Sequence, residues 1–235
     1  MLTKSNKTLK ESDAPRLIVS EEPKSVISEQ FRTIRMNLKF SLVDKELRTL
    51  VVTSATPSSG KSTISVNLAA TIASEDKKVL IVDADLRKPK VHKIFKVRNH
   101  SGLTSLLTNR HAKLESMVHQ TSIKGLSFMT SGAIPPNPAE LLGSNRMAEL
   151  LDEMKSSYDL IIFDTPPVLA VTDSRVLASE TDGVILVIPK GQVKADEVIS
   201  AKEALETVKS NILGAVMNRV DPSNDRYNYY YASEE

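Results

Sequence analysis

The sequence predicts a three-layer α/β/α fold with a mostly parallel central sheet. Its apolar segments of strand length are continuous runs, such as the one over 79–83, rather than alternating ones. Continuous runs are expected where both faces of a parallel strand are covered. Segments with helical periodicity separate them, and strand–helix alternation with right-handed crossovers gives layered α/β folds. Ligands of such sheets bind beyond the carboxyl ends of the strands, where we therefore expect the functional residues.

The N-terminal half begins with a polar, basic stretch over 1–20, which we expect to be a flexible leader. A helix is predicted from 22 to about 43, because apolar residues recur there at spacings of four, three and four. These residues are Ile27, Phe31, Ile34 and Leu38. The other elements predicted in this half are a strand over 47–55, a helix over 61–74, a strand over 79–83 and short helices within the mixed basic stretch 84–125.

The C-terminal half continues this alternation until residue 221, where the apolar pattern stops. We divide the chain into a leader (1–20), one folded domain that starts with a helix (21–220) and a flexible, tyrosine-rich tail (221–235). The elements predicted in this half are a strand over 126–130, a helix over 138–154, strands over 160–163 and 184–188, a helix over 194–209 and a strand over 212–220.

Composition narrows the classes of function. A chain of 235 residues can form one large domain with a substantial core. The absence of Cys excludes disulfide scaffolds, thiolate zinc sites and cysteine nucleophiles. A net charge of +2 creates no strong field that would attract nucleic acid, so no such partner is expected. No apolar run approaches the roughly 18 residues that span a bilayer, so we expect a cytoplasmic protein that reaches a membrane only through a partner.

Residues 55–63, ATPSSGKST, follow a predicted strand and open a predicted helix. They match the phosphate-binding pattern G-x-x-x-x-G-K-[ST], except that Ala55 replaces the first glycine. Alanine resists the left-handed conformation that glycine often adopts, which weakens the match slightly. Backbone N–H groups and the Lys61 charge are expected on the phosphates, and the Ser62 hydroxyl on Mg²⁺. The predicted nucleotide-binding residues of the loop are Pro57, Ser58, Ser59, Gly60, Lys61, Ser62 and Thr63.

Two of the predicted strands end in acidic residues. Asp83 and Asp85, two positions apart, place both carboxylates on one side of an extended chain, and Asp164 ends a second strand. Acids at the ends of buried strands are costly without a cation, which Mg²⁺ held by nucleotide phosphates provides. For Asp164 alone, a helix-capping or turn role stays open. Arg87 is expected to neutralise phosphate or to contact another subunit. The predicted metal ligands are Ser62, Asp83, Asp85 and Asp164.

These motifs resemble those of the bacterial tyrosine kinases, or BY-kinases, of exopolysaccharide and capsule operons. The resemblance spans about residues 22–235 and implies a P-loop NTPase fold with Walker A, A′ and B motifs. Walker A is the loop 55–63, A′ is ΦΦΦDxDxR over 80–87 and B is ΦΦΦDxxP over 161–167, where Φ is apolar. An E-x-x-R-x-x-R pattern in the first helix and a C-terminal tyrosine cluster complete the resemblance.

The resemblance implies an enzyme, an ATP- and Mg²⁺-dependent protein-tyrosine kinase. A tyrosine hydroxyl, with an ordinary pKa of about 10, is a poor nucleophile at neutral pH unless a carboxylate accepts its proton. By resemblance, Asp83 is this base and Asp85 helps to hold Mg²⁺, and the two roles are exchangeable. Asp164 is the Walker B acid, and Lys61 stabilises charge on the transferred phosphoryl group. Asn218, at the end of the last predicted strand, is expected to touch the base of the nucleotide.

The tyrosine cluster is the feature that a simple ATPase explains least. The resemblance implies that these tyrosines are phosphorylated in trans within a ring-like homo-oligomer. Its subunits are expected to contact one another through Glu29, Arg32 and Arg35, and added phosphate charge is expected to loosen the ring. The tyrosines of the cluster are Tyr227, Tyr229, Tyr230 and Tyr231.

Partners are implied by the same resemblance. A kinase chain without membrane helices is similar to the Firmicutes type, in which a separate transmembrane activator docks its cytoplasmic tail on the kinase. Such an activator would recruit the chain to the inner face of the cell membrane. Protein substrates of polysaccharide synthesis and a counteracting tyrosine phosphatase are also implied.

Three other classes of protein stay open. A MinD- or ParA-like positioning ATPase shares the fold, but it carries a second lysine where this chain has Thr56, five residues before Lys61. A GTPase is suggested by NRVD over 218–221, which differs from the guanine-reading pattern NKxD by one residue. A non-catalytic module that only binds nucleotide has no need of the intact acids.

Overall fold

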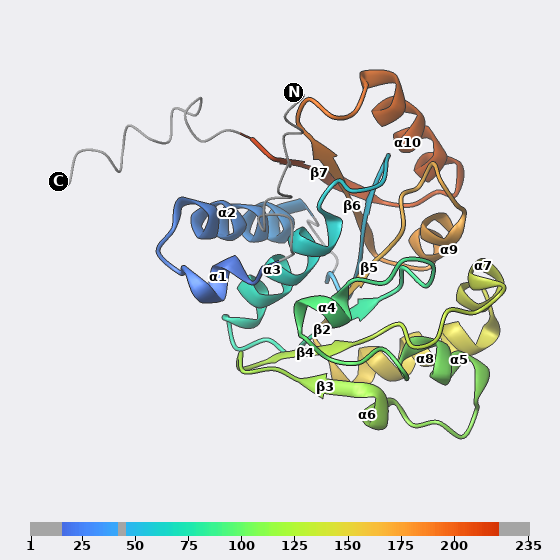
Figure 1. Cartoon of the computed structure of the whole chain (residues 1–235). Coiled ribbons are helices and arrows are strands. Elements are labelled where there is room, and N and C mark those ends of the chain that lie inside the picture. Colours follow the sequence, from blue (N-terminus) through green and yellow to red (C-terminus); the bar gives the residue numbers. More distant parts are fainter. Residues whose placement is uncertain (1–15, 42–45, 221–235) are drawn as a thin grey trace, which may run out of the picture.

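The computed structural model describes residues 16–41 and 46–220, and within these ranges it confirms the three-layer α/β/α fold. The sheet has the strand order β3-β4-β2-β5-β1-β6-β7 (Figure 1). All neighbouring strands are parallel except β3 and β4, which are antiparallel. The seven strands are β1 (Thr49–Ser54), β2 (Val79–Asp83), β3 (Val118–Gln120), β4 (Leu126–Met129), β5 (Leu160–Asp164), β6 (Gly183–Pro189) and β7 (Ile212–Asn218).

Helices cover both faces of this sheet (Figure 1). Helices α2 and α3 pack on one face, and α8, α9 and α10 pack on the other. The helices of the described residues are α1 (Ile18–Glu21), α2 (Val26–Ser41), α3 (Lys61–Ala73), α4 (Val91–Ile94), α5 (Leu103–Thr108), α6 (Leu114–Met117), α7 (Pro138–Leu142), α8 (Asn145–Ser157), α9 (Asp173–Ser179) and α10 (Ala195–Thr207).

The hydrophobic core is divided by the sheet into two clusters. Successive side chains of a strand point to opposite faces. In β1, Val51 therefore joins the cluster under α8 and α9, whereas Leu50 and Val52 join the cluster under α2 and α3. All three side chains are buried, which explains why the central strands read as continuous apolar runs.

The three central strands position the functional residues. Strand β5 pairs with β2 on one side and with β1 on the other, all in parallel. Their carboxyl ends therefore meet at one edge of the sheet, and the register places Asp83 of β2 directly opposite Asp164 of β5. The phosphate-binding loop leaves β1 at this same edge.

Most predicted elements are confirmed, but three differ from the prediction. The single helix predicted over 138–154 is wrong: α7 ends before Gly143, and Ser144 starts α8 by accepting a hydrogen bond from the backbone N–H of Met147 at 3.2 Å. Strand β3 was not predicted, because it has only three residues and none is buried. Helix α9 was not predicted either, since seven residues are too few for a clear period.

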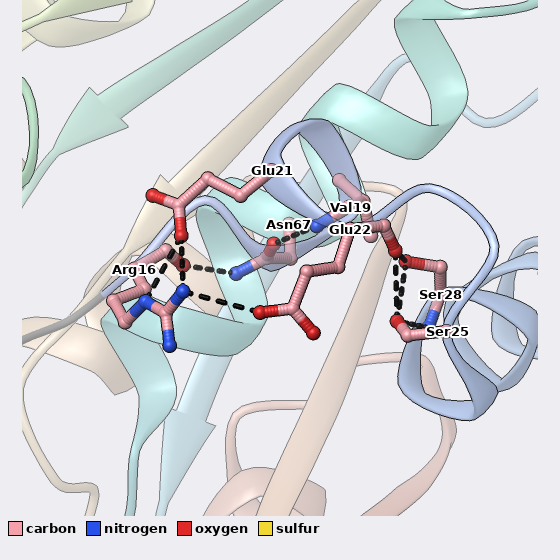
Figure 2. A network of polar contacts seen from close by, with 7 residues as sticks. All are labelled: Arg16, Val19, Glu21, Glu22, Ser25, Ser28 and Asn67. Carbon is pink, nitrogen blue, oxygen red and sulfur yellow. Dashed lines mark hydrogen bonds and ion pairs between the residues drawn. The ribbon is translucent and has the colours of Figure 1, made fainter. Parts of the chain in front are cut away.

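The predicted leader over 1–20 lies outside the described residues as far as residue 15. Residues 18–21 form α1, which is tied to α3 through the side chain of Asn67 (Figure 2). Asn67 Oδ1 accepts a hydrogen bond from the Val19 N–H at 3.1 Å, and its Nδ2 donates to the Arg16 carbonyl at 2.7 Å. The N-terminal helical segment is thus fastened to the helix that follows the phosphate loop.

Across the described ranges 16–41 and 46–220, none of the helices combines the length and the apolar character required to cross a bilayer.

Candidate functional site

The phosphate loop turns from β1 into α3 through two residues with positive φ. Ser58 has a φ of 59° and Gly60, which precedes the first residue of α3, has a φ of 87°. Ala55 is buried and is not among the positive-φ residues, so alanine is accommodated at the position of the first glycine without backbone strain. No side chain caps the start of α3, which leaves its first N–H groups free for an anion.

The end of β7 holds this loop from the side. Asn218 Nδ2 donates a hydrogen bond to the carbonyl of Ser59 at 2.9 Å, and Arg219 Nη2 donates to the carbonyl of Ser58 at 2.9 Å. The amide nitrogen of Asn218 is therefore engaged with the phosphate loop, and the predicted contact of Asn218 with the base stays a prediction. The role of Arg219 was not predicted, since the sequence shows it only as part of the NRVD stretch.

Replacement of Gly60 by alanine is expected to weaken ADP binding at least about tenfold. A Cβ atom would lie 2.1 Å from Asn218 Nδ2, and a φ of 87° strains any L side chain by about 1–2 kcal/mol. Calorimetric titration with Mg-ADP measures the effect. Gly191→Ala is the matched control, because Gly191 also has a positive φ but has nothing within 4 Å of its Cβ position. Equal affinities of Gly60→Ala and Gly191→Ala for Mg-ADP would contradict the expectation that the close approach of Gly60 to Asn218 matters for nucleotide binding.

Asp83 and Asp164 lie side by side and are almost completely buried. Asp83 Oδ2 accepts hydrogen bonds from the backbone N–H groups of Lys90 and Val91, both at 2.9 Å. Its other oxygen, Oδ1, is buried and has no hydrogen-bond partner among the described residues. Asp164 Oδ1 accepts a hydrogen bond from the Ser65 hydroxyl at 3.3 Å. The pair therefore presents acceptor oxygens without enough donors.

Burial and proximity raise the pKa of both carboxyl groups. Burial is the main cause at Asp164, whose pKa rises to about 6 although Lys61 and the hydroxyls of Ser62 and Ser65 lower it. The pKa of Asp83 is raised well above its ordinary value, first by burial and then by the charge of Asp164. Burial lowers the pKa of Lys61, against the opposing effect of Asp164 and Asp85. Two acids and one lysine are thus held in a site that needs further counter-charge.

These residues fit a Mg²⁺ ion that is shared with phosphates. Mg²⁺ takes hard oxygen ligands and usually binds one or two carboxylates together with water and substrate phosphates. The unpaired Asp83 Oδ1 and the acidic oxygens near Lys61 supply such ligands. In the described part of the chain, no three His, Cys, Asp or Glu side chains form a metal site by themselves. The predicted ligands Ser62, Asp83, Asp85 and Asp164 are therefore not a complete protein cage.

Arg87 forms an ion pair within this chain that the sequence did not predict. Its guanidinium binds the carboxylate of Asp173, with Nε to Oδ2 at 2.9 Å and Nη2 to Oδ1 at 3.0 Å. The Arg87 side chain is 42% exposed, and its predicted contact with phosphate or with another subunit stays a prediction. Asp173 was missed, because an acid at the start of a short helix carries no distinctive signal in a sequence.

Glu29, Arg32 and Arg35 lie on α2, which packs on α3. Arg32 pairs with Glu29 and also donates to the Pro23 carbonyl at 2.5 Å. Arg35 turns towards α3 of the same chain, where it donates to the Thr71 carbonyl at 3.1 Å, and it pairs at 3.0 Å with Glu75, which lies just beyond the end of α3. Their predicted role between subunits stays a prediction. The four predicted phosphorylation sites over 227–231 lie outside the described residues.

A phosphate loop at the end of β1, flanked by acids at the ends of β2 and β5, defines a P-loop nucleotide-binding domain. Residues 47–215 match the family model described as "AAA domain". Tyrosine-protein kinase YwqD of Bacillus subtilis is 49% identical over 215 residues, which cover 91% of this chain and 90% of that protein. CapB of Staphylococcus aureus is 40% identical over 226 residues, which cover 96% of this chain and 99% of CapB. The chain belongs to the bacterial tyrosine-protein kinases.

Solved structures agree with this assignment. The crystal structure of the chimerical protein CapA2B2 superposes with a TM-score of 0.83 at 44% identity, over 87% of this chain and 89% of that one. The septum site-determining protein MinD of Pyrococcus horikoshii, complexed with Mg-ADP, has a TM-score of 0.63 at 24% identity, over 75% of this chain and 72% of MinD. MinD shares the fold alone, and the positioning-ATPase alternative is not favoured.

Proposed function

We propose that this chain transfers the γ-phosphoryl group of ATP to tyrosine hydroxyls, with Mg²⁺ as the metal ion. The observation that carries this proposal is the buried Asp83 carboxylate, with one free oxygen and a raised pKa, at the edge of the sheet where the phosphate loop lies. Membership of the bacterial tyrosine-protein kinases supports tyrosine as the acceptor.

Each residue of the site has a distinct role in this reaction. The N–H groups at the start of α3 and the Lys61 ammonium hold the phosphates and stabilise charge that develops during transfer. Ser62, Asp83, Asp85 and Asp164 would hold Mg²⁺, which would neutralise negative charge on the phosphates and the acids. Asp83 accepts the proton of the attacking hydroxyl, because its Oδ1 has no hydrogen-bond partner among the described residues. Asp85 and Asp164 supply the remaining acidic oxygens.

We further propose that the acceptors are the tail tyrosines of a neighbouring copy in a ring-like homo-oligomer, and that Glu29, Arg32 and Arg35 contribute to the contact between copies. A cytoplasmic chain recruited to the inner face of the membrane by a transmembrane activator fits this proposal. Proteins of polysaccharide synthesis are its proposed further substrates, and a tyrosine phosphatase is proposed to reverse the reaction.

A kinase assay with purified protein and Mg-ATP tests the proposed function. It is run with and without a cytoplasmic fragment of an activator, and mass spectrometry locates the phosphate. Lys61→Met is expected to abolish phosphotyrosine, because it removes the only side-chain charge that the loop 55–63 offers to the phosphates. Lys124→Met is the matched control, since the ammonium of Lys124 is exposed and pairs with Asp76.

Phosphotyrosine within residues 227–231 that is lost in Lys61→Met and kept in Lys124→Met would support the proposal. ATP hydrolysis without phosphotyrosine, even with the activator fragment, would overturn it.

A further inference from the structure

The Arg87–Asp173 ion pair joins two segments that are 86 positions apart in the sequence. Arg87 follows β2 and Asp173 is the first residue of α9. Two parallel N–H···O bonds, at 2.9 and 3.0 Å, connect the guanidinium to both carboxylate oxygens. This two-point geometry fixes the direction as well as the distance of the contact, which the single ammonium of a lysine does not do.

The burial of Asp173 shows that this contact is built into the fold. Its side chain is 0% exposed, and a buried carboxylate is costly unless a cation pairs with it. The Arg87 side chain is 42% exposed, so the arginine reaches in from the surface to neutralise the acid. The hydrogen bonds to Asp173 raise the pKa of Arg87 further above its ordinary value.

The two segments that the pair joins are those that carry the catalytic acids. On the Arg87 side, the turn after β2 holds Asp85, whose Oδ1 accepts a hydrogen bond from the Lys88 N–H at 2.9 Å. The same turn supplies the Lys90 and Val91 N–H groups that bind Asp83 Oδ2. Any movement of this turn therefore moves Asp85 and alters the hydrogen bonds of Asp83.

On the Asp173 side, the segment between β5 and α9 is fixed to β1. The Thr165 hydroxyl donates to the Val52 carbonyl at 2.9 Å, and the Thr53 hydroxyl donates to the Pro166 carbonyl at 2.9 Å. The Val168 N–H donates to the Ser54 carbonyl at 2.8 Å. Asp173 thus follows a segment that is fixed to the strand leading into the phosphate loop. The turn after β2 is joined to that segment by Arg87, in addition to its own hydrogen bonds with Asp83.

We infer that Arg87 is a positioning residue: its two-point contact with Asp173 holds the turn after β2 so that Asp83 stays opposite Asp164 and Asp85 stays near Lys61, in the geometry that phosphoryl transfer requires. This inference rests on the proposed function. In this role Arg87 acts on the reaction through the two acids. Loss of the contact affects the transfer step more than the binding of nucleotide, because the phosphate loop is held separately by Asn218 and Arg219.

Steady-state kinetics of Arg87→Gln test this inference. The kcat for phosphotyrosine and for release of inorganic phosphate is expected to fall about 10- to 100-fold, and the Mg²⁺ concentration for half-maximal rate to rise. The affinity for Mg-ADP, measured by calorimetry, is expected to stay within about threefold of the wild type. Arg87→Lys is expected to recover only part of kcat. Arg146→Gln is the matched control, since Arg146 also pairs with a carboxylate, that of Glu149 on α8.

The double variant Arg87→Met/Asp173→Asn separates positioning from stability. Arg87→Gln leaves the Asp173 charge buried and unpaired, so its melting temperature is expected to fall. The double variant removes both charges and is expected to regain most of the melting temperature without regaining kcat. Recovery of kcat together with the melting temperature would overturn the inference and show a purely structural pair.

Two further outcomes would also overturn the inference that Arg87 is a positioning residue. A loss of Mg-ADP affinity of tenfold or more in Arg87→Gln, with kcat retained, would show that Arg87 binds nucleotide directly. An unchanged kcat and Mg²⁺ dependence in Arg87→Gln would show that the contact positions nothing. Failure of the proposed kinase function is distinguishable, because the wild type would then release inorganic phosphate without forming phosphotyrosine.

Discussion

Replacement of Asp83 by asparagine is expected to lower phosphotyrosine formation by about 100- to 10,000-fold, the usual contribution of a positioned general base. Asparagine keeps an oxygen that accepts the two hydrogen bonds from the backbone of Lys90 and Val91, so the turn after β2 is expected to stay in place. It cannot accept the proton of the tyrosine hydroxyl. Single-turnover assays with preloaded Mg-ATP measure this step apart from nucleotide binding.

Asp76→Asn is the matched control for this substitution, because its carboxylate is exposed and pairs with Lys124. Asp85→Asn in the same assay shows which of the two acids accepts the proton and which serves the metal. If Asp83 is the base and Asp85 serves the metal, only Asp85→Asn shows a rate that recovers as Mg²⁺ is raised. Recovery of Asp83→Asn by Mg²⁺, and not of Asp85→Asn, would exchange the two roles.

Replacement of Asp164 by asparagine is expected to stabilise the nucleotide-free protein at pH 7 while it abolishes activity. The pKa of Asp164 rises to about 6 in the folded chain, from an ordinary value of 3.8. The ionised form that prevails at pH 7 is therefore disfavoured by folding, by at most about 3 kcal/mol. An uncharged amide avoids this cost and can still accept the hydrogen bond from Ser65.

The pH dependence of stability follows from the same pKa shift. Between pH 3.8 and about 6, the folded state binds more protons at Asp164 than the unfolded state does. The free energy of unfolding therefore falls as pH rises through this range, and the contribution of Asp83 has the same sign. Urea denaturation in the presence of EDTA is expected to show this fall in the wild type and in Asp76→Asn, and a smaller fall in Asp164→Asn. If the free energy of unfolding of Asp164→Asn fell equally or more steeply over this pH range, the result would contradict a raised pKa at Asp164.

The phosphate loop and the acids were predictable because their signals are local. Residues 55–63 carry their whole pattern in nine consecutive positions. The prediction that Asp83 and Asp164 meet needs only the rule that parallel strands present their carboxyl ends at one edge of a sheet. The slight weakness expected from Ala55 is the exception, because the positive φ angles of the loop fall on Ser58 and Gly60 instead.

The contacts that support the site were not predictable because they join distant positions. Arg87 and Asp173 are 86 positions apart, and neither residue type in its own segment indicates the other. The break between α7 and α8 at Gly143 was likewise not predictable, since an isolated glycine within a helical pattern is often tolerated. Sequence patterns thus predict the groups that act on the substrate better than the groups that hold them in place.

The hydrogen bonds to the phosphate loop from Asn218, which ends β7, and from Arg219, which follows it, span 159 and 161 positions. During synthesis, the loop therefore leaves the ribosome long before the strand that fixes its shape. A nascent chain that stops short of β7 contains the entire phosphate-binding motif but lacks the two side chains that hold the Ser58 and Ser59 carbonyls. The shape of the loop is then expected to be fixed only when β7 joins the sheet beside β6.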